Sequence, residues 1–152
     1  MISIKAALTF LASSTVVLGV ALPEPAAAVP ATACTTGAPV TTAGYPIRYY
    51  AQATPRPGRF ENGYQPEPRW SSQHLAGSYT FGVPEPVETG FAYAQFKCQY
   101  YCENQSEGGS FFVRADEKVG SHCECYDELM DPDTFVNSNQ TLIGAWNAIC
   151  RT

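Results

Sequence analysis

The sequence predicts an α+β fold in which one short helix is held by disulfides to antiparallel β-strands. Two cysteine spacings within residues 91–126 lead to this prediction. Cys98 and Cys102 have the spacing that puts two side chains on one face of a helix, with Cβ atoms about 5–6 Å apart. Cys123 and Cys125 have the spacing that puts both on one face of a strand, about 6.6 Å apart. Because these separations nearly match, a helix lying on a hairpin could form two neighbouring disulfides.

The helix is predicted over residues 90–104. Gly108 and Gly109 follow it and favour its end. Its apolar stripe has helical spacing and contains both thiols. The members of this stripe are Phe91, Ala94, Cys98, Tyr101 and Cys102.

Short strands are expected on both sides of this helix. Residues 37–90 are rich in proline and glycine, so no helix of useful length is expected there, and residues 54–70 are expected to form a long loop. Alternating apolar residues or strand-sized segments between breakers predict the strands. These are residues 47–51, 78–81, 110–116 and 121–126, with a closing strand over residues 141–150.

The N-terminal residues predict a secretory signal peptide over residues 1–21. Lys5 precedes an apolar run over residues 6–20, and small residues follow; cleavage after Ala28 is the alternative. The run is shorter than the roughly 20 residues that a membrane anchor needs. Residues 22–33 form a Pro/Ala-rich spacer and residues 34–152 a single disulfide-stapled domain. The expected location is therefore extracellular, with no membrane attachment after signal removal.

Six cysteines follow the predicted signal, and an even set in an oxidising compartment favours disulfides over metal ligands. Six cysteines permit about 15 pairings, and spacing alone does not choose among them. A second hairpin strand running parallel to the helix favours one set: Cys98 with Cys123, Cys102 with Cys125, and Cys34 with Cys150.

No metal or cofactor is predicted. His122 beside Cys123 and Cys125 suggests zinc, but the cysteine spacing is shorter than that of structural zinc pairs and no second histidine is near. The acidic residues 126–133 suggest calcium, but they lack the central glycine and distal glutamate of a calcium loop. A solvated acidic loop is the expectation there.

Binding through exposed aromatic side chains is the predicted function. Phe60, Tyr64 and Trp70 lie in the expected loop and are the candidate binding residues. A polysaccharide or an extracellular protein is the expected partner of a monomer, while the net charge of −5 argues against nucleic acid. Asn104 and Asn139 begin N-glycosylation sequons.

No catalytic residues are predicted, because the chain offers only two histidines, His74 and His122, as general acids or bases. One alternative is a secreted ribonuclease-like hydrolase that uses His74, Arg69 and a carboxylate, either Glu85 or Glu88. Another alternative is an effector-like or structural surface protein without catalytic activity.

The segments AYAQFKCQYYCE, GGSFFV and HCECY resemble the PAN/apple-like cysteine-rich modules of small secreted fungal proteins. The resemblance implies a helix packed on a curved antiparallel sheet, with terminal cysteines that join the chain ends. These modules usually carry a cysteine at the start of the strand after the helix, where this chain has Ser110. Cys123 on the neighbouring strand would compensate. The resemblance also implies recognition of proteins or carbohydrates, without nominating contact residues.

Overall fold

The computed structural model describes residues 34–83, 86–105, 109–116 and 120–150. The predicted signal peptide and spacer, residues 1–33, lie outside these ranges. In chain order the elements are β1 (Val40–Thr42), β2 (Tyr45–Ile47), β3 (Tyr50–Gln52), β4 (Tyr64–Pro66), α1 (Pro68–His74), β5 (Leu75–Phe81), α2 (Val87–Gln105), β6 (Ser110–Asp116), β7 (Gly120–Tyr126), β8 (Phe135–Asn137) and β9 (Ile143–Ala148).

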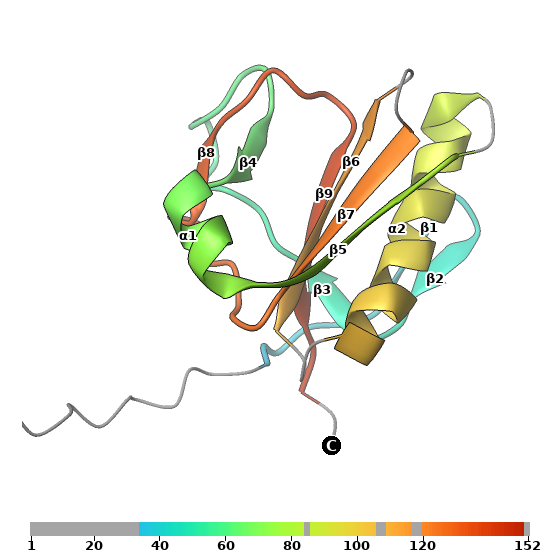
Figure 1. Cartoon of the computed structure of the whole chain (residues 1–152), viewed down its shortest axis with the longest axis horizontal. Coiled ribbons are helices and arrows are strands. Elements are labelled where there is room, and N and C mark those ends of the chain that lie inside the picture. Colours follow the sequence, from blue (N-terminus) through green and yellow to red (C-terminus); the bar gives the residue numbers. More distant parts are fainter. Residues whose placement is uncertain (1–33, 84–85, 106–108, 117–119, 151–152) are drawn as a thin grey trace, which may run out of the picture.

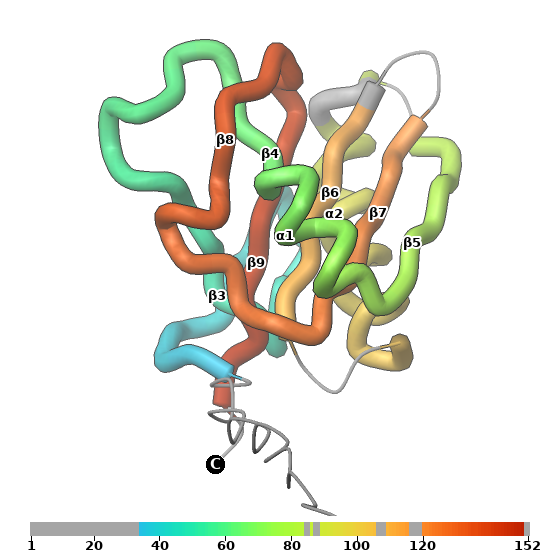
Figure 2. Tube along the Cα trace, turned by 60° about the vertical axis from the view of Figure 1, so that its left-hand side comes forward, coloured from blue at the N-terminus to red at the C-terminus, as the bar shows by residue number. Residues whose placement is uncertain are grey.

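A five-stranded antiparallel sheet, in the order β3-β9-β6-β7-β5, forms the centre of the protein. Helix α2 and the β1–β2 hairpin lie on one face of this sheet, and α1 with the β4–β8 pair lies on the other (Figure 1). The view in Figure 2 shows α1 in front of β6 and β7, with α2 behind them. The predicted α+β class is confirmed, with two helices in place of the one that was expected.

Two disulfides join α2 to β7, as the cysteine spacings predicted. The Cα atoms are 5.6 Å apart in Cys98–Cys123 and 5.2 Å apart in Cys102–Cys125, and all four side chains are buried. A third disulfide, Cys34–Cys150, closes the domain end to end with a Cα separation of 4.9 Å. The predicted pairing is therefore confirmed at each bridge.

The sheet separates two hydrophobic cores because successive strand residues point to opposite faces. On β6, Phe111 and Val113 face α2 and the disulfides, whereas Phe112 faces α1. On β9, Trp146 belongs to the first core and Ala145 to the second. These two strands thus contribute apolar side chains to both layers.

Two glutamines on the inner side of α2 complete its attachment. Gln95 is nearly buried, and its Oε1 accepts a hydrogen bond from Trp146 Nε1 at 3.1 Å. Gln99 is fully buried; its Oε1 accepts from the Arg48 backbone N at 3.0 Å, and its Nε2 donates to the Pro46 carbonyl at 2.8 Å. These bonds join α2 to β9 and to the end of the β1–β2 hairpin.

Helix α1 corrects the expectation that residues 37–90 contain only strands and loops. Glu67 caps the helix: its carboxylate accepts from the backbone N of Arg69 at 3.0 Å and of Trp70 at 2.8 Å. Pro68 occupies the first turn, where its fixed φ suits a helix and its missing N–H costs no hydrogen bond. Proline therefore starts this element rather than excluding it.

The strand predictions hold best near the disulfides. Strand β6 has the predicted bounds, β7 begins one residue before its predicted start, and α2 begins at Val87 rather than at residue 90. The expected strand over residues 47–51 is divided between β2 and β3, because the chain leaves the small hairpin and enters the main sheet there. Strands β4 and β8 were not predicted.

Removing both bridges between α2 and β7 should unfold the protein or greatly weaken it. The variant Cys98→Ser with Cys102→Ser loses two native disulfides, each worth about 2–5 kcal/mol in a small domain. We expect loss of folded secreted protein, or a large fall in the urea midpoint of whatever is recovered. Wild-type yield and an unchanged midpoint would contradict the central role of these bridges.

Candidate functional site

One side of α2 is mostly aromatic. Five of its residues recur at positions i, i+3, i+4, i+7 and i+8, which form one stripe on a helix: Tyr93, Phe96, Lys97, Tyr100 and Tyr101. Side chains from β2 and β5 extend the stripe on both sides. We call the complete set the aromatic face: Tyr45, Tyr79, Phe81, Tyr93, Phe96, Lys97, Tyr100 and Tyr101.

One half of the aromatic face connects α2 to the β1–β2 hairpin. The ring of Tyr45 lies 5.6 Å from that of Tyr93 and 5.5 Å from that of Phe96, centroid to centroid. The Phe96 ring in turn meets Tyr100 edge-on at 5.1 Å. These tilted and edge-on contacts are favourable geometries for aromatic pairs.

The other half connects α2 to the edge strand β5. The ring of Tyr79 stacks on Phe81 at 5.3 Å and on Tyr101 at 5.0 Å, and the Tyr101 hydroxyl donates to the Ser78 carbonyl at 3.0 Å. Tyr79 is 42% exposed and Tyr100 is 37% exposed, the highest values among the large aromatic residues of the described chain. An aromatic surface therefore remains open to solvent after the core has formed.

Lys97 lies where the two halves meet. Its Nζ is 4.8 Å from the ring centroid of Phe81, 5.6 Å from that of Tyr93 and 6.0 Å from that of Tyr79. Each distance falls within the range of a cation–π interaction. Rings from both α2 and β5 thus hold one ammonium group at the centre of the aromatic face.

The aromatic residues nominated from the sequence lie on the opposite side of the sheet. Phe60, Tyr64 and Trp70 come together around the second core, and all three are partly buried. Burial raises the pKa of the Tyr64 phenol above its ordinary value. The Trp70 ring lies 4.9 Å from that of Tyr126 and 5.0 Å from that of His74.

These three side chains are less exposed than expected because they turn inward and pack on the second core, while most other residues of 54–70 remain exposed. The helical spacing of Tyr93, Phe96, Tyr100 and Tyr101 is the sequence signal for the stripe that contains exposed Tyr100. Tyr101, expected on the inner stripe with the thiols, packs against the first core and also stacks on Tyr79.

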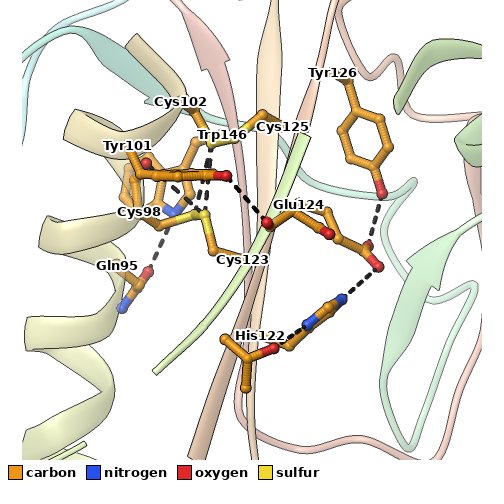
Figure 3. The surroundings of a disulfide bond; sticks show 12 residues. Gln95, Cys98, Tyr101, Cys102, His122, Cys123, Glu124, Cys125, Tyr126 and Trp146 are labelled. Carbon is orange, nitrogen blue, oxygen red and sulfur yellow. Dashed lines mark hydrogen bonds and ion pairs between the residues drawn. A yellow bond between two sulfur atoms is a disulfide. The ribbon is translucent and has the colours of Figure 1, made fainter. Parts of the chain in front are cut away.

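A chain of polar side chains crosses the face of the sheet that α1 covers. The Thr80 hydroxyl is 3.0 Å from His122 Nδ1, and His122 Nε2 is 3.1 Å from Glu124 Oε1 (Figure 3). The Tyr126 hydroxyl donates to Glu124 Oε2 at 2.8 Å, so Ser71 of α1 is the donor in its 3.1 Å contact with Tyr126. Burial first, and then Glu124, raise the pKa of the Tyr126 phenol well above its ordinary value.

The acid–base groups in this series of polar contacts hydrogen-bond to one another. The side chains of His122 and Glu124 are 29% and 21% exposed, and both ring nitrogens of His122 have a partner. Arg114 is the cross-strand neighbour of His122. A histidine, a carboxylate and an arginine are groups that acid–base cleavage of a phosphodiester can use.

His74, the histidine nominated for a hydrolase, is held in a different contact. Its Nδ1 lies 3.0 Å from Asp127 and its Nε2 2.9 Å from Glu128, which fastens the end of α1 to the loop after β7. Arg69 is exposed on α1. Glu85 and the side chain of Glu88 lie outside the described residues, so the grouping proposed from the sequence stays a prediction.

The acidic segment 126–133 is paired rather than only solvated. Asp133 accepts from Arg56 Nε at 2.8 Å and from Arg59 Nη1 at 3.1 Å, in addition to the His74 contacts. The sulfurs of Cys98, Cys102 and Cys123 lie within 4.8 Å of one another, a spacing that a metal could use. These sulfurs are joined in disulfides and so carry no thiolate to act as a ligand.

Both sequon asparagines are exposed. Asn104 lies in the last turn of α2, where its Nδ2 donates to the Tyr100 carbonyl at 2.8 Å, and Asn139 follows β8 on the other side of the sheet. Glycosylation at these positions stays a prediction.

Comparison of the chain with models of known protein families, with curated proteins and with solved structures found no match. The resemblance to PAN/apple-like modules therefore stays an expectation from the sequence. Within the described residues, no helix has the length and apolar character needed to cross a membrane.

Acid should weaken the contacts of Glu67 and Asp133, because the pKa of each carboxyl is lowered in the folded protein. The main causes are the Arg69 backbone hydrogen bond for Glu67 and the Arg56 side-chain hydrogen bond for Asp133. A lowered pKa stabilises the fold above the unfolded value of about 4, and this contribution is lost as the pH falls through the folded pKa. Thermal unfolding between neutral and acidic pH measures the effect.

The double variant Glu67→Gln with Asp133→Asn should show a shallower loss of melting temperature below about pH 4 than the wild type. Glu61→Gln is the matched control, because Glu61 is exposed and pairs with none of the described residues. Identical acid profiles for the double variant and the wild type would refute the assignment.

Proposed function

We propose that this protein is a secreted, non-catalytic binding module that recognises a polysaccharide through the aromatic face of α2. One observation carries the proposal: two rings of the aromatic face, those of Tyr79 and Tyr100, are exposed although aromatic side chains also fill both cores. Phe81 of this face is buried, and its other members are partly buried. The relative exposure of Tyr79 and Tyr100 exceeds a third, whereas Phe111, Phe112 and Phe135 are at most 1% exposed. Exposed and mutually fixed aromatic side chains are typical of binding surfaces.

A sugar polymer suits the chemistry of this face better than an apolar partner does. Five of its eight members are tyrosines, each of which combines an apolar ring with a hydroxyl that can donate or accept a hydrogen bond. A sugar ring likewise has apolar C–H faces and a rim of hydroxyls. Ring contacts within the aromatic face restrict the rotamers, so binding orders few additional side chains.

Secretion is part of the proposal. Three disulfides are typical of a domain that folds in an oxidising compartment, and residues 1–21 have the composition of a signal peptide. A net charge of −5 disfavours nucleic acid as the partner. We place the protein outside the cell as a monomer.

Truncating the exposed rings should weaken polysaccharide binding without unfolding the protein. We expect the variant Tyr79→Ala with Tyr100→Ala to bind chitin or β-glucan at least about tenfold more weakly in pull-down depletion assays, with a melting temperature close to that of the wild type. Tyr79→Phe with Tyr100→Phe keeps the rings and should retain most of the affinity.

Trp70→Ala separates this surface from the aromatic residues nominated by the sequence. It should lower stability, since Trp70 packs on the second core, and leave the affinity of the remaining folded protein unchanged. If Trp70→Ala abolishes binding while the Tyr79 and Tyr100 variant binds normally, the ligand site lies on the α1 side. If no polysaccharide binds the wild type, the proposed function is wrong.

The polar chain favours a ribonuclease-like hydrolase as a second candidate function, with His122 and Glu124 as the acid–base pair and Arg114 facing the phosphate. RNA hydrolysis by the purified protein is the test. Under this alternative His122→Ala lowers the rate of RNA hydrolysis by about a hundredfold or more. His74→Ala does not lower it, because His74 takes no part in the contacts between His122, Glu124 and Tyr126. Absence of RNA cleavage by the wild type would eliminate this candidate.

A further inference from the structure

Lys97 is the charged residue at the centre of the aromatic face, and it is the one lysine in the described ranges. Lys5 and Lys118 lie outside them. The side chain is partly exposed, and Phe81, Tyr93 and Tyr79 hold its ammonium group from two elements. A flexible side chain with large rotamer entropy is thereby kept near one position.

The ammonium group lacks an anionic partner in the described part of the chain. The paired carboxylates there are used elsewhere: Asp127 and Glu128 contact His74, Asp133 contacts Arg56 and Arg59, Glu124 contacts His122 and Tyr126, and Glu67 caps α1. The net charge is −5, yet this cation has no anionic partner among the described residues of the aromatic face and its surroundings.

Cation–π contacts orient the ammonium group without neutralising it. A ring face provides a quadrupole rather than a countercharge, and it accepts no conventional hydrogen bond from the three N–H donors of a lysine. Those donors are available to a ligand. A carboxylate is the complementary group, because a hydrogen bond between two charged groups is about twice as strong as a neutral one.

We propose that the polysaccharide bound by the aromatic face is an acidic one, whose sugar carboxylates pair with Lys97 while Tyr79 and Tyr100 contact the sugar rings. This inference rests on the proposed function and names its substrate class. The net negative charge of the protein repels a polyanion at long range, so recognition depends on this local pair and not on general attraction to acidic polymers.

Two forms of one polymer test the proposal with the wild-type protein. Polygalacturonate and its fully methyl-esterified form have the same sugar backbone and differ in the charge of the carboxyl group. Isothermal titration calorimetry at about 0.1 M salt should show about five- to tenfold tighter binding to the acidic form. Dextran sulfate, a polyanion without carboxylates, should bind no better than the ester.

Two variants assign the preference to Lys97. Lys97→Gln should bind both forms with nearly equal affinity, and Lys97→Arg, which keeps the cation and its ring contacts, should retain the preference for the acidic form. Melting temperatures confirm that both variants are folded. The comparison of the two polymers needs only the wild type, so the preference for the acidic form is tested even if a variant is unstable.

The possible results separate this inference from the proposed function. Equal binding of the wild type to both forms, or an unchanged preference in Lys97→Gln, overturns the role of Lys97 while a polysaccharide module stands. Binding to chitin or β-glucan without binding to polygalacturonate likewise overturns the role of Lys97 and leaves the polysaccharide module standing. Failure to bind any of these polymers overturns both proposals.

Discussion

The rest of the structure depends on the two disulfides between α2 and β7. One bridge would leave the helix free to rotate about a single point, but two bridges one helical turn apart fix both its position and its rotation. Gln95 and Gln99 add hydrogen bonds from the same inner side of α2. Because the inner stripe is fixed in this way, the outer stripe of aromatic side chains has a defined position, and the hairpin and edge strand beside it complete the surface.

Aromatic residues have two separate roles on opposite sides of the sheet. Around α1 they close the second core: Tyr64 packs on Phe112 and Phe135, and Trp70 packs on Tyr126. The series of polar contacts runs from exposed Thr80 to Ser71 of α1 on the same side of the sheet, and it pairs the polar groups that strand alternation places there. Around α2, in contrast, ring contacts stabilise a layer in which Tyr79 and Tyr100 remain exposed within the described structure. Exposure therefore distinguishes a candidate site from core packing where residue type does not.

The third disulfide, between Cys34 and Cys150, joins the two ends of the disulfide-stapled domain. Cys34 and Cys150 lie 116 residues apart in sequence, and Thr35 pairs with Ile149 in a parallel bridge beside them. Closing so long a loop removes much conformational freedom from the unfolded chain. This constraint fixes Cys34 and Thr35 beside the end of β9. Strand β3, which pairs with β9, is one edge of the sheet, and β5, the opposite edge, carries Tyr79 and Phe81 of the aromatic face.

The sequence by itself determined the disulfide-linked helix and hairpin, because thiol spacing and strand alternation are local patterns with fixed geometry. It also determined the α+β class, and it favoured the cysteine pairing that the structure confirms. Only the tertiary structure decided which aromatic side chains remain exposed. Phe60, Tyr64 and Trp70 lie in a segment rich in proline, yet long-range contacts with the sheet partly bury them; Tyr79 and Tyr100 stay open because no described element packs over the outer side of α2. Burial depends on contacts between residues distant in sequence, which local composition does not encode.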